Sequence, residues 1–143
     1  MKNILYTLAL LVFFSSFGQT EEIIGDYYPN GAVRWKGNYD VNGKAQGKNT
    51  WYYKSGAVKS IRNFVDNVQQ GQWIFYYESG AVKSISNYVD DREHGESIEY
   101  YESGEIKEIG KYKEGYIIKE IEYYENGEIK EIRNYKNGWL IEN

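Results

Sequence analysis

The chain of 143 residues has no cysteine, and it contains only one histidine, one methionine and one proline. The absence of cysteine excludes disulfides, thiolate metal ligands and cysteine nucleophiles. The sequence also lacks a glycine-rich phosphate loop, a G-x-S-x-G motif and any pairing of a nucleophile with histidine. We therefore expect a protein that is not an enzyme, with no catalytic residue, no cofactor and no metal ion.

The single histidine, His94, lies beside Asp90, Asp91 and Glu93 in the stretch DDREHG. A histidine among carboxylates can bind a metal ion, but this cluster offers no second nitrogen or sulfur ligand. We interpret the stretch as a solvated connecting loop.

Positive charge is scarce, since the formal net charge is −4. An acidic chain is a poor candidate for binding nucleic acid, so we predict no such partner. Residues 26–73 hold seven basic and three acidic side chains, whereas residues 74–143 hold nine basic and sixteen acidic ones. This polarity favours a complementary charged partner or head-to-tail self-association.

A long apolar run is also missing. After Lys2 the chain has a mainly apolar stretch of 11 residues, Ile4–Phe14, whereas a membrane-spanning helix needs about 20. A short apolar stretch followed by small residues is the layout of a secretory signal peptide. We predict a signal peptide over residues 1–18, cleavage near Gly18/Gln19, and an exported chain, periplasmic or secreted, over 19–143. A retained helical anchor or a buried core helix is the alternative.

Aromatic residues are abundant, with 16 tyrosines, 5 phenylalanines and 4 tryptophans, so the chain is expected to fold. A doubled tyrosine before a turn recurs five times, as YYPNG, YYKSG, YYESG, YYESG and YYENG. The turn glycines are Gly31, Gly56, Gly80, Gly104 and Gly127. Spacings of 25, 24, 24 and 23 residues between these glycines indicate an array of repeats.

Two further columns accompany the glycines. A β-branched residue follows each glycine by two positions, and an aromatic residue follows it by eight. Such residues on both sides of Ser-Gly or Asn-Gly predict two strands joined by a tight turn, in which glycine supplies the positive φ. A single hairpin is not stable in water, so neighbouring hairpins must stack.

The fold class we predict is all-β, an elongated single-sheet meander of about five stacked hairpins with roughly ten strands. The expected copies lie near residues 26-49, 50-73, 74-97, 98-120 and 121-143. One feature of the pattern stays open. The valine and aromatic columns stand at even offsets from the glycine, whereas Ile61, Ile85, Ile109 and Ile132 stand at the odd fifth position. Either a β-bulge intervenes or both sheet faces are partly apolar.

The pattern Tyr-Tyr-x-Asn/Ser-Gly, then Val or Ile, then an aromatic residue and a glycine-bearing turn, resembles the MORN-repeat variant common in bacterial proteins. The resemblance covers about residues 25–141. It implies a curved sheet of hairpins that serves as a scaffold or protein-binding surface, with membrane or cell-envelope contact as a further option. Bacterial variants are often labelled antitoxins of toxin–antitoxin systems, which would fit an exported chain if the toxin acts in the periplasm or outside.

Cell-wall choline-binding repeats also carry Trp-Tyr-Tyr strands, as in the stretch TWYY at residues 50–53. Those repeats are shorter and keep a Gly-Trp pair in each copy. The four tryptophans of this chain occupy no common column: Trp35, Trp51, Trp73 and Trp139. A repeated aromatic cage for quaternary ammonium is therefore not predicted.

Two columns are candidates for partner binding. One tyrosine of each pair should point outward and could stack on sugars or protein side chains, unless both rows hold hairpin to hairpin. A basic residue follows each turn glycine by three positions, and glutamates flank the last two of the five. The tyrosine candidates are Tyr28, Tyr53, Tyr77, Tyr101 and Tyr124, and the basic candidates are Arg34, Lys59 and Lys83. A solvated, locally paired sheet face is the alternative for the basic column.

The sequence therefore predicts an exported, non-enzymatic repeat protein that presents a protein-binding or scaffold surface. An antitoxin or immunity-type component is one alternative. A binder of envelope glycan or polymer through exposed aromatics is the other. The last residues, WLIEN at 139–143, resemble the opening strand of a sixth copy and are expected to cap the array.

Overall fold

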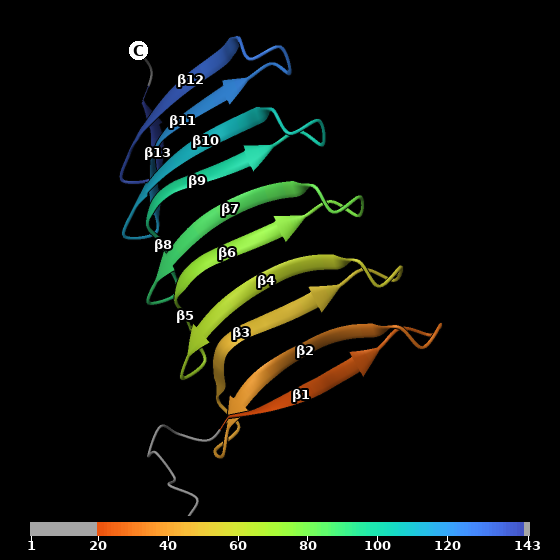
Figure 1. The fold of residues 1–143 in the computed structure, drawn as a ribbon. Coiled ribbons are helices and arrows are strands. Elements are labelled where there is room, and N and C mark those ends of the chain that lie inside the picture. Colours follow the sequence, from red (N-terminus) through yellow and green to blue (C-terminus); the bar gives the residue numbers. More distant parts are fainter. Residues whose placement is uncertain (1–19, 142–143) are drawn as a thin grey trace, which may run out of the picture.

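A computed structural model describes residues 20–141. In that part of the chain thirteen strands and no helix form a single open antiparallel sheet, in which the hairpins stack in sequence order (Figure 1). The predicted all-β, single-sheet meander is confirmed. No helix of these residues is long and apolar enough to cross a membrane. The predicted signal peptide lies outside the described residues.

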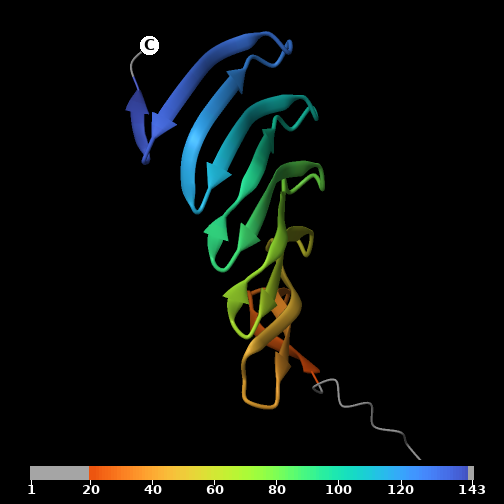
Figure 2. The same ribbon diagram turned by 90° about the vertical axis from the view of Figure 1, so that its left-hand side faces the viewer.

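The eleven strands of the main path follow one another in space as they do in the sequence. Their bounds are β1 Thr20–Tyr27, β2 Val33–Asp40, β3 Ala45–Tyr52, β4 Val58–Val65, β6 Gly71–Tyr76, β7 Val82–Val89, β9 Gly95–Tyr100, β10 Ile106–Lys113, β11 Tyr116–Tyr123, β12 Ile129–Lys136 and β13 Trp139–Ile141. The two-residue strands β5 (Val68–Gln69) and β8 (Arg92–Glu93) pair back onto β4 and β7. The view turned by 90° shows the sheet twisting along the array, with no second layer against residues 20–141 (Figure 2).

Each doubled tyrosine leads into a tight turn that ends at the repeat glycine. In the second copy, Gly56 N–H donates to the carbonyl of Tyr53, and Tyr53 N–H donates to the carbonyl of Ala57. The five turn glycines have φ between 82° and 97°, a conformation that residues with a Cβ adopt only at a cost. A register shift accompanies every one of these turns; beside the turn at Gly56, Tyr52 pairs with Val58 but Trp51 pairs with Ser60. Such a shift is the mark of a β-bulge.

The bulge resolves the mismatch between even and odd offsets, because it re-phases the strand by one residue. Val58 pairs with Tyr52 before the bulge, whereas Ser60 pairs with Trp51 after it. The valine column therefore shares a face with the isoleucine column, and the aromatic column points to the other face. The bulge and the two apolar faces, which the sequence offers as alternatives, are both present.

One face, here called the isoleucine face, carries an unbroken row of isoleucines. Every neighbour in the row is a register partner of the next across seven consecutive strands of the main path. The row consists of Ile61, Ile74, Ile85, Ile98, Ile109, Ile121 and Ile132. Cross-strand pairs of branched side chains stabilise a sheet, so this row links one repeat to the next.

The opposite face, here called the aromatic face, carries Trp35, Trp51, Trp73, Phe75 and the aromatic column. Partners in register place Trp35 opposite Trp51, and Ser60 between Trp51 and Phe75. The rings of the aromatic column lie opposite small residues, in the pairs Gly47–Phe64, Gly71–Tyr88 and Gly95–Tyr112. Alternation of large and small side chains lets the rings lie over the backbone of the neighbouring strand.

Candidate functional site: the aromatic face

The second tyrosine of each pair ties its repeat to the following one. The hydroxyl of Tyr53 donates to the carbonyl of Tyr76 at 2.7 Å, and the hydroxyl of Tyr77 donates to the carbonyl of Tyr100 at 2.7 Å. Tyr28 and Tyr101 make the equivalent bonds to the next copy at 2.8 Å each. These four tyrosines are half-buried. Burial raises the pKa of Tyr77, so its hydroxyl remains a donor.

The fifth candidate, Tyr124, differs because no following doubled tyrosine exists. Its side chain is 51% exposed, and no hydrogen bond of its hydroxyl occurs within residues 20–141. Four of the five tyrosine candidates thus have structural hydroxyl groups, while the role of all five rings in partner binding stays a prediction.

The basic candidates lie above the rings of these tyrosines. The charged groups of Arg34, Lys59 and Lys83 stand 5.8, 5.7 and 5.8 Å from the ring centroids of their own turn tyrosines. Arg34 also pairs with Asp26 at 3.1 Å. Among the described residues, Lys59 and Lys83 have no carboxylate within ion-pair distance. A cation over a ring is attracted by about 0.5–1 kcal/mol at exposed sites, which leaves the charge accessible to a partner.

A further cation, Arg62, lies among three rings at the centre of this surface. Its guanidinium carbon is 4.4 Å from the centroid of Trp51, 4.7 Å from that of Trp73 and 5.2 Å from that of Phe75. Burial lowers the pKa of Arg62. Its Nε and the indole N–H of Trp73 are buried without a hydrogen-bond partner among residues 20–141. The result is a stacked, incompletely satisfied cation on the face of the sheet.

A shallow groove adjoins this cluster. It has a volume of about 340 Å³ and runs over the first four strands. Its lining residues are Asp26, Tyr28, Arg34, Trp35, Trp51, Tyr52 and Lys59. Trp51 belongs both to the groove and to the stack on Arg62, so the two form one continuous surface. Two tryptophans with nearby cations can hold a planar or acidic group.

The second half of the same face is acidic. Glu99, Glu108, Glu122 and Glu131 are successive partners in register on adjacent strands. Arg133 bonds Glu120, Glu122 and Glu131, while Lys107 and Lys130 bond Glu99 at 2.9 Å and Glu122 at 2.6 Å. The fourth glutamate, Glu108, has no such partner in the described part of the chain.

Titration in this half follows from burial and charge. Burial, followed by the charges of Glu120 and Glu99, raises the pKa of Glu108. Burial also raises the pKa of Tyr112 to about 12. The aromatic face therefore changes from aromatic and basic to carboxylate-rich along the array, in line with the charge polarity of the sequence.

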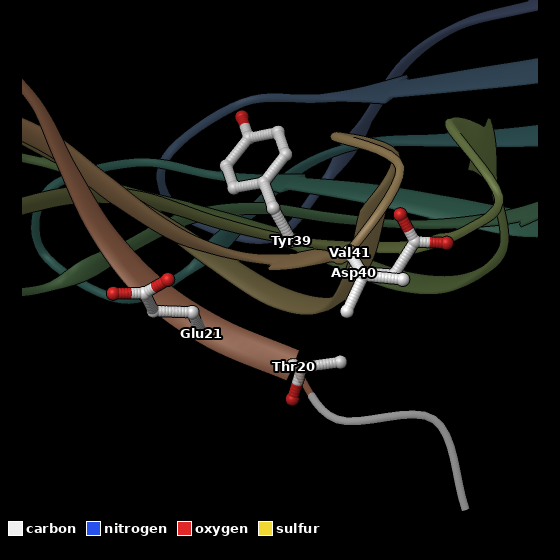
Figure 3. Close-up of a pocket in the computed structure, with 5 residues that line it drawn as sticks. All are labelled: Thr20, Glu21, Tyr39, Asp40 and Val41. Atoms are coloured by element: carbon white, nitrogen blue, oxygen red, sulfur yellow. The ribbon is translucent and has the colours of Figure 1, made fainter.

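Two other hollows lie at the end of the sheet where successive repeats are connected. One of about 290 Å³ is lined by Thr20, Glu21, Tyr39, Asp40 and Val41, whose side chains point in different directions (Figure 3). His94 lines another with Asp90, Arg92 and Glu114. No group of three or more potential ligands in residues 20–141 could hold a metal ion.

The residues that sequence reasoning missed as site residues are Trp35, Trp51, Trp73 and Phe75. The tryptophans stand at different offsets from their glycines, so no column pointed to them. Pairing across strands nevertheless brings them to one surface. The signal that could have found them is the alternation of side chains along a strand. Each lies an even number of residues from another side chain of the same face in its own strand.

The fold and this surface define an open β-hairpin repeat array. The family model described as "MORN repeat variant" matches residues 45–66, 69–90, 93–114 and 118–137, which together make up more than half of the chain. The chain belongs to this MORN repeat variant family. The matches begin at β3, and the hairpin of β1 and β2 continues the same sheet before them.

No curated protein matches the chain. Among solved structures, it is similar to accessory secretory protein 1, 2 and 3 of Streptococcus pneumoniae, with 18% identity, a TM-score of 0.27, and coverage of 83% of this chain and 17% of that one. It is also similar to a GtfA/B complex bound to UDP and GlcNAc, with 13% identity, a TM-score of 0.29, and coverage of 87% and 25%. The chain spans a quarter or less of both, and at these TM-scores the likeness carries no argument.

Proposed function

We propose that this MORN repeat protein is an exported, non-enzymatic scaffold whose aromatic face binds a protein partner. The surface formed by Trp35, Trp51, Arg62, Lys59 and Lys83 supports this most directly. It combines aromatic rings and arginine, which are enriched at the energetic centres of protein interfaces. It also contains cations without a carboxylate partner within the described residues.

The partner should present carboxylates beside apolar groups. Arg62 is half-buried and its Nε has no hydrogen-bond partner within residues 20–141, so a carboxylate reaching it would satisfy a group that is now desolvated. The export proposal depends on the amino-terminal pattern of charge, apolar stretch and small residues. An immunity-type role would place a toxin on this same surface, and it differs only in the identity of the partner.

Site-specific photocrosslinking in cells tests the proposal. A photoreactive phenylalanine analogue replaces Lys59 on the aromatic face, and in a matched strain it replaces Lys111, an exposed residue on the isoleucine face. We expect one defined adduct with a different protein from position 59 and no such adduct from position 111. The adduct should disappear when Trp51→Ala is added and persist with Trp139→Ala, which changes a tryptophan that is 81% exposed at the far end. Equal adducts with a different protein from both faces, or an adduct at position 59 that is insensitive to Trp51, would refute the proposed surface.

A glycan is a second candidate ligand, favoured by the two tryptophans in the 340 Å³ groove. Sugar rings stack on exposed aromatic faces, and an acidic sugar would also meet Arg34 and Lys59. Titration with soluble, acidic cell-wall oligosaccharides should then quench tryptophan fluorescence in the native chain and in Trp139→Ala, and not in Trp51→Ala. Quenching that survives Trp51→Ala would exclude this groove.

A further inference from the structure

The isoleucine face is the apolar surface that the proposed partner site does not use. Six of the seven isoleucines in its central row are half-buried, and Ile132 at one end is 42% exposed. Stable domains bury an apolar sheet face against a second layer. No second layer covers this face in residues 20–141.

A second, parallel row widens this apolar band. The first tyrosine of each pair and the β-branched residue after the turn are register partners on this face, as in Tyr76–Val82 and Tyr100–Ile106. On the other side of the isoleucines, Asn63, Gln72 and Asn87 are uncharged. Over β4, β6 and β7 the face thus carries no charged side chain, and on the next two strands Glu96 pairs with Lys111 at 3.6 Å.

We propose that a second copy of this chain covers the isoleucine face, giving a back-to-back dimer of two sheets. The first argument is charge: a twofold contact buries the middle of each surface against the other copy, so charges without a partner there would be desolvated. The isoleucine face carries no charged side chain over β4, β6 and β7, and its charged residues on β9, β10 and β11, Glu96, Lys111 and Lys119, lie in the row beside the isoleucines. The aromatic face is less suited, because Arg62, Lys59 and Lys83 lie on it without a carboxylate partner among the described residues.

The second argument is period. The row repeats one branched side chain at every strand, a spacing of about 4.8 Å. A surface with the same period can insert its ridges between these side chains, as facing sheets do in sandwiches at about 10 Å separation. A second copy has this period by construction.

The third argument is area. Seven strands give a row roughly 29 Å long between its ends, and three rows of side chains give a band roughly 20 Å wide. The footprint is roughly 600 Å² per copy, or roughly 1,200 Å² in total, which is the lower limit for specific interfaces. The dimer should therefore be reversible, with dissociation in the micromolar range. Both aromatic faces then point outward, so the dimer would be bivalent for its partner.

Sedimentation velocity of the full-length chain, purified as the cell processes it, tests the dimer between about 1 and 200 µM. We expect a monomer–dimer equilibrium in the native protein and a monomer in Ile85→Lys, which places a charge in the middle of the band. Lys83→Glu, two residues away on the aromatic face, is the matched control and should dimerise as the native chain does. A native chain that stays monomeric throughout, or an Ile85→Lys variant that dimerises normally, overturns the proposal.

A second measurement does not depend on the folding of Ile85→Lys. The chain has no cysteine, so a single cysteine can be introduced without interference. A twofold axis through the middle of the row brings Ile98 opposite its equivalent, and a short bismaleimide should link Ile98→Cys dimers but not Lys83→Cys on the other face. Linking through position 83 alone overturns the proposal. Sedimentation with anionic phospholipid vesicles that requires Ile85, in a chain that is otherwise monomeric, would also overturn it and assign the face to a membrane.

Discussion

Removal of the tyrosine hydroxyls that link successive repeats should destabilise the array by a predictable amount. Tyr77→Phe deletes a half-buried donor 2.7 Å from the carbonyl of Tyr100 and leaves that carbonyl without its partner. The phenyl ring remains, so stacking with Lys83 is preserved. A hydrogen bond of this kind contributes about 1 kcal/mol to the free energy of unfolding. A loss of about 1 kcal/mol in the free energy of unfolding lowers the melting temperature of a domain of this size by roughly 3–6 °C.

The series has an internal control. Tyr53→Phe and Tyr101→Phe should each cost about as much as Tyr77→Phe, because all three bonds have the same geometry. The triple variant should lose about 3 kcal/mol, since the sites share no partner and should be nearly additive. Tyr124→Phe removes a hydroxyl without a bond in the described residues and should change stability by less than about 0.3 kcal/mol.

Urea unfolding monitored by far-ultraviolet circular dichroism measures these differences, with the slope expected to stay constant across the series. A loss in Tyr124→Phe equal to that in Tyr77→Phe would contradict the reasoning, because the effect would then belong to the ring environment. Losses below about 0.3 kcal/mol for all three linking tyrosines would show that the hydroxyls do not hold the repeats together.

Three further changes test other parts of the fold. Glu108→Gln should raise the free energy of unfolding by about 0.5 kcal/mol at pH 7. The pKa of Glu108 is raised in the folded state, so its ionisation costs stability as pH rises above the ordinary glutamate value of 4.5. The gain should vanish below that pH in urea titrations, and a gain that persists at pH 3 would contradict this cause. Deletion of 139–143 should lower the melting temperature, because β13 covers the edge of β12 through three register pairs, and an unchanged midpoint would refute the cap. Gly80→Val should cost about 1–2 kcal/mol in urea unfolding, because φ is 92° at this turn, and a neutral result would show that the turn can change type.

The architecture could be predicted from the sequence because the residues of the repeat columns determine local structure. Glycine at a position with positive φ and aromatic or β-branched flanks determine a hairpin, and repetition determines stacking. The expected number of about ten strands was low, since the loops after β4 and β7 form β5 and β8. Positive φ at Asp66, Asn67, Asp90 and Asp91 turns the chain back there. Nothing in VDNVQQG or VDDREHG marks a two-residue strand.

The surface was harder to predict than the fold. Three of the seven row isoleucines, Ile74, Ile98 and Ile121, stand six residues before their turn glycines, a column that the repeat analysis did not use and that Thr50 interrupts in the second copy. The stack of Arg62 on Trp51 and Trp73 joins residues from three strands, so it depends on register and not on spacing. The hydroxyl of Tyr53 donates to a main-chain carbonyl, an acceptor that every residue offers and that no sequence pattern reveals.

That last property has an evolutionary consequence. The tyrosine hydroxyl bonds the main chain of the following copy, so it requires no particular side chain in that copy. A duplicated copy inserted into the array would offer the same main-chain carbonyl at the same place. After deletion of a copy, the tyrosine hydroxyl could bond the carbonyl of the copy that then follows. The side chains between these hydrogen bonds can then differ from copy to copy. Gene duplication can therefore lengthen this protein, and selection can change its surface from basic to acidic, without altering how its units are connected.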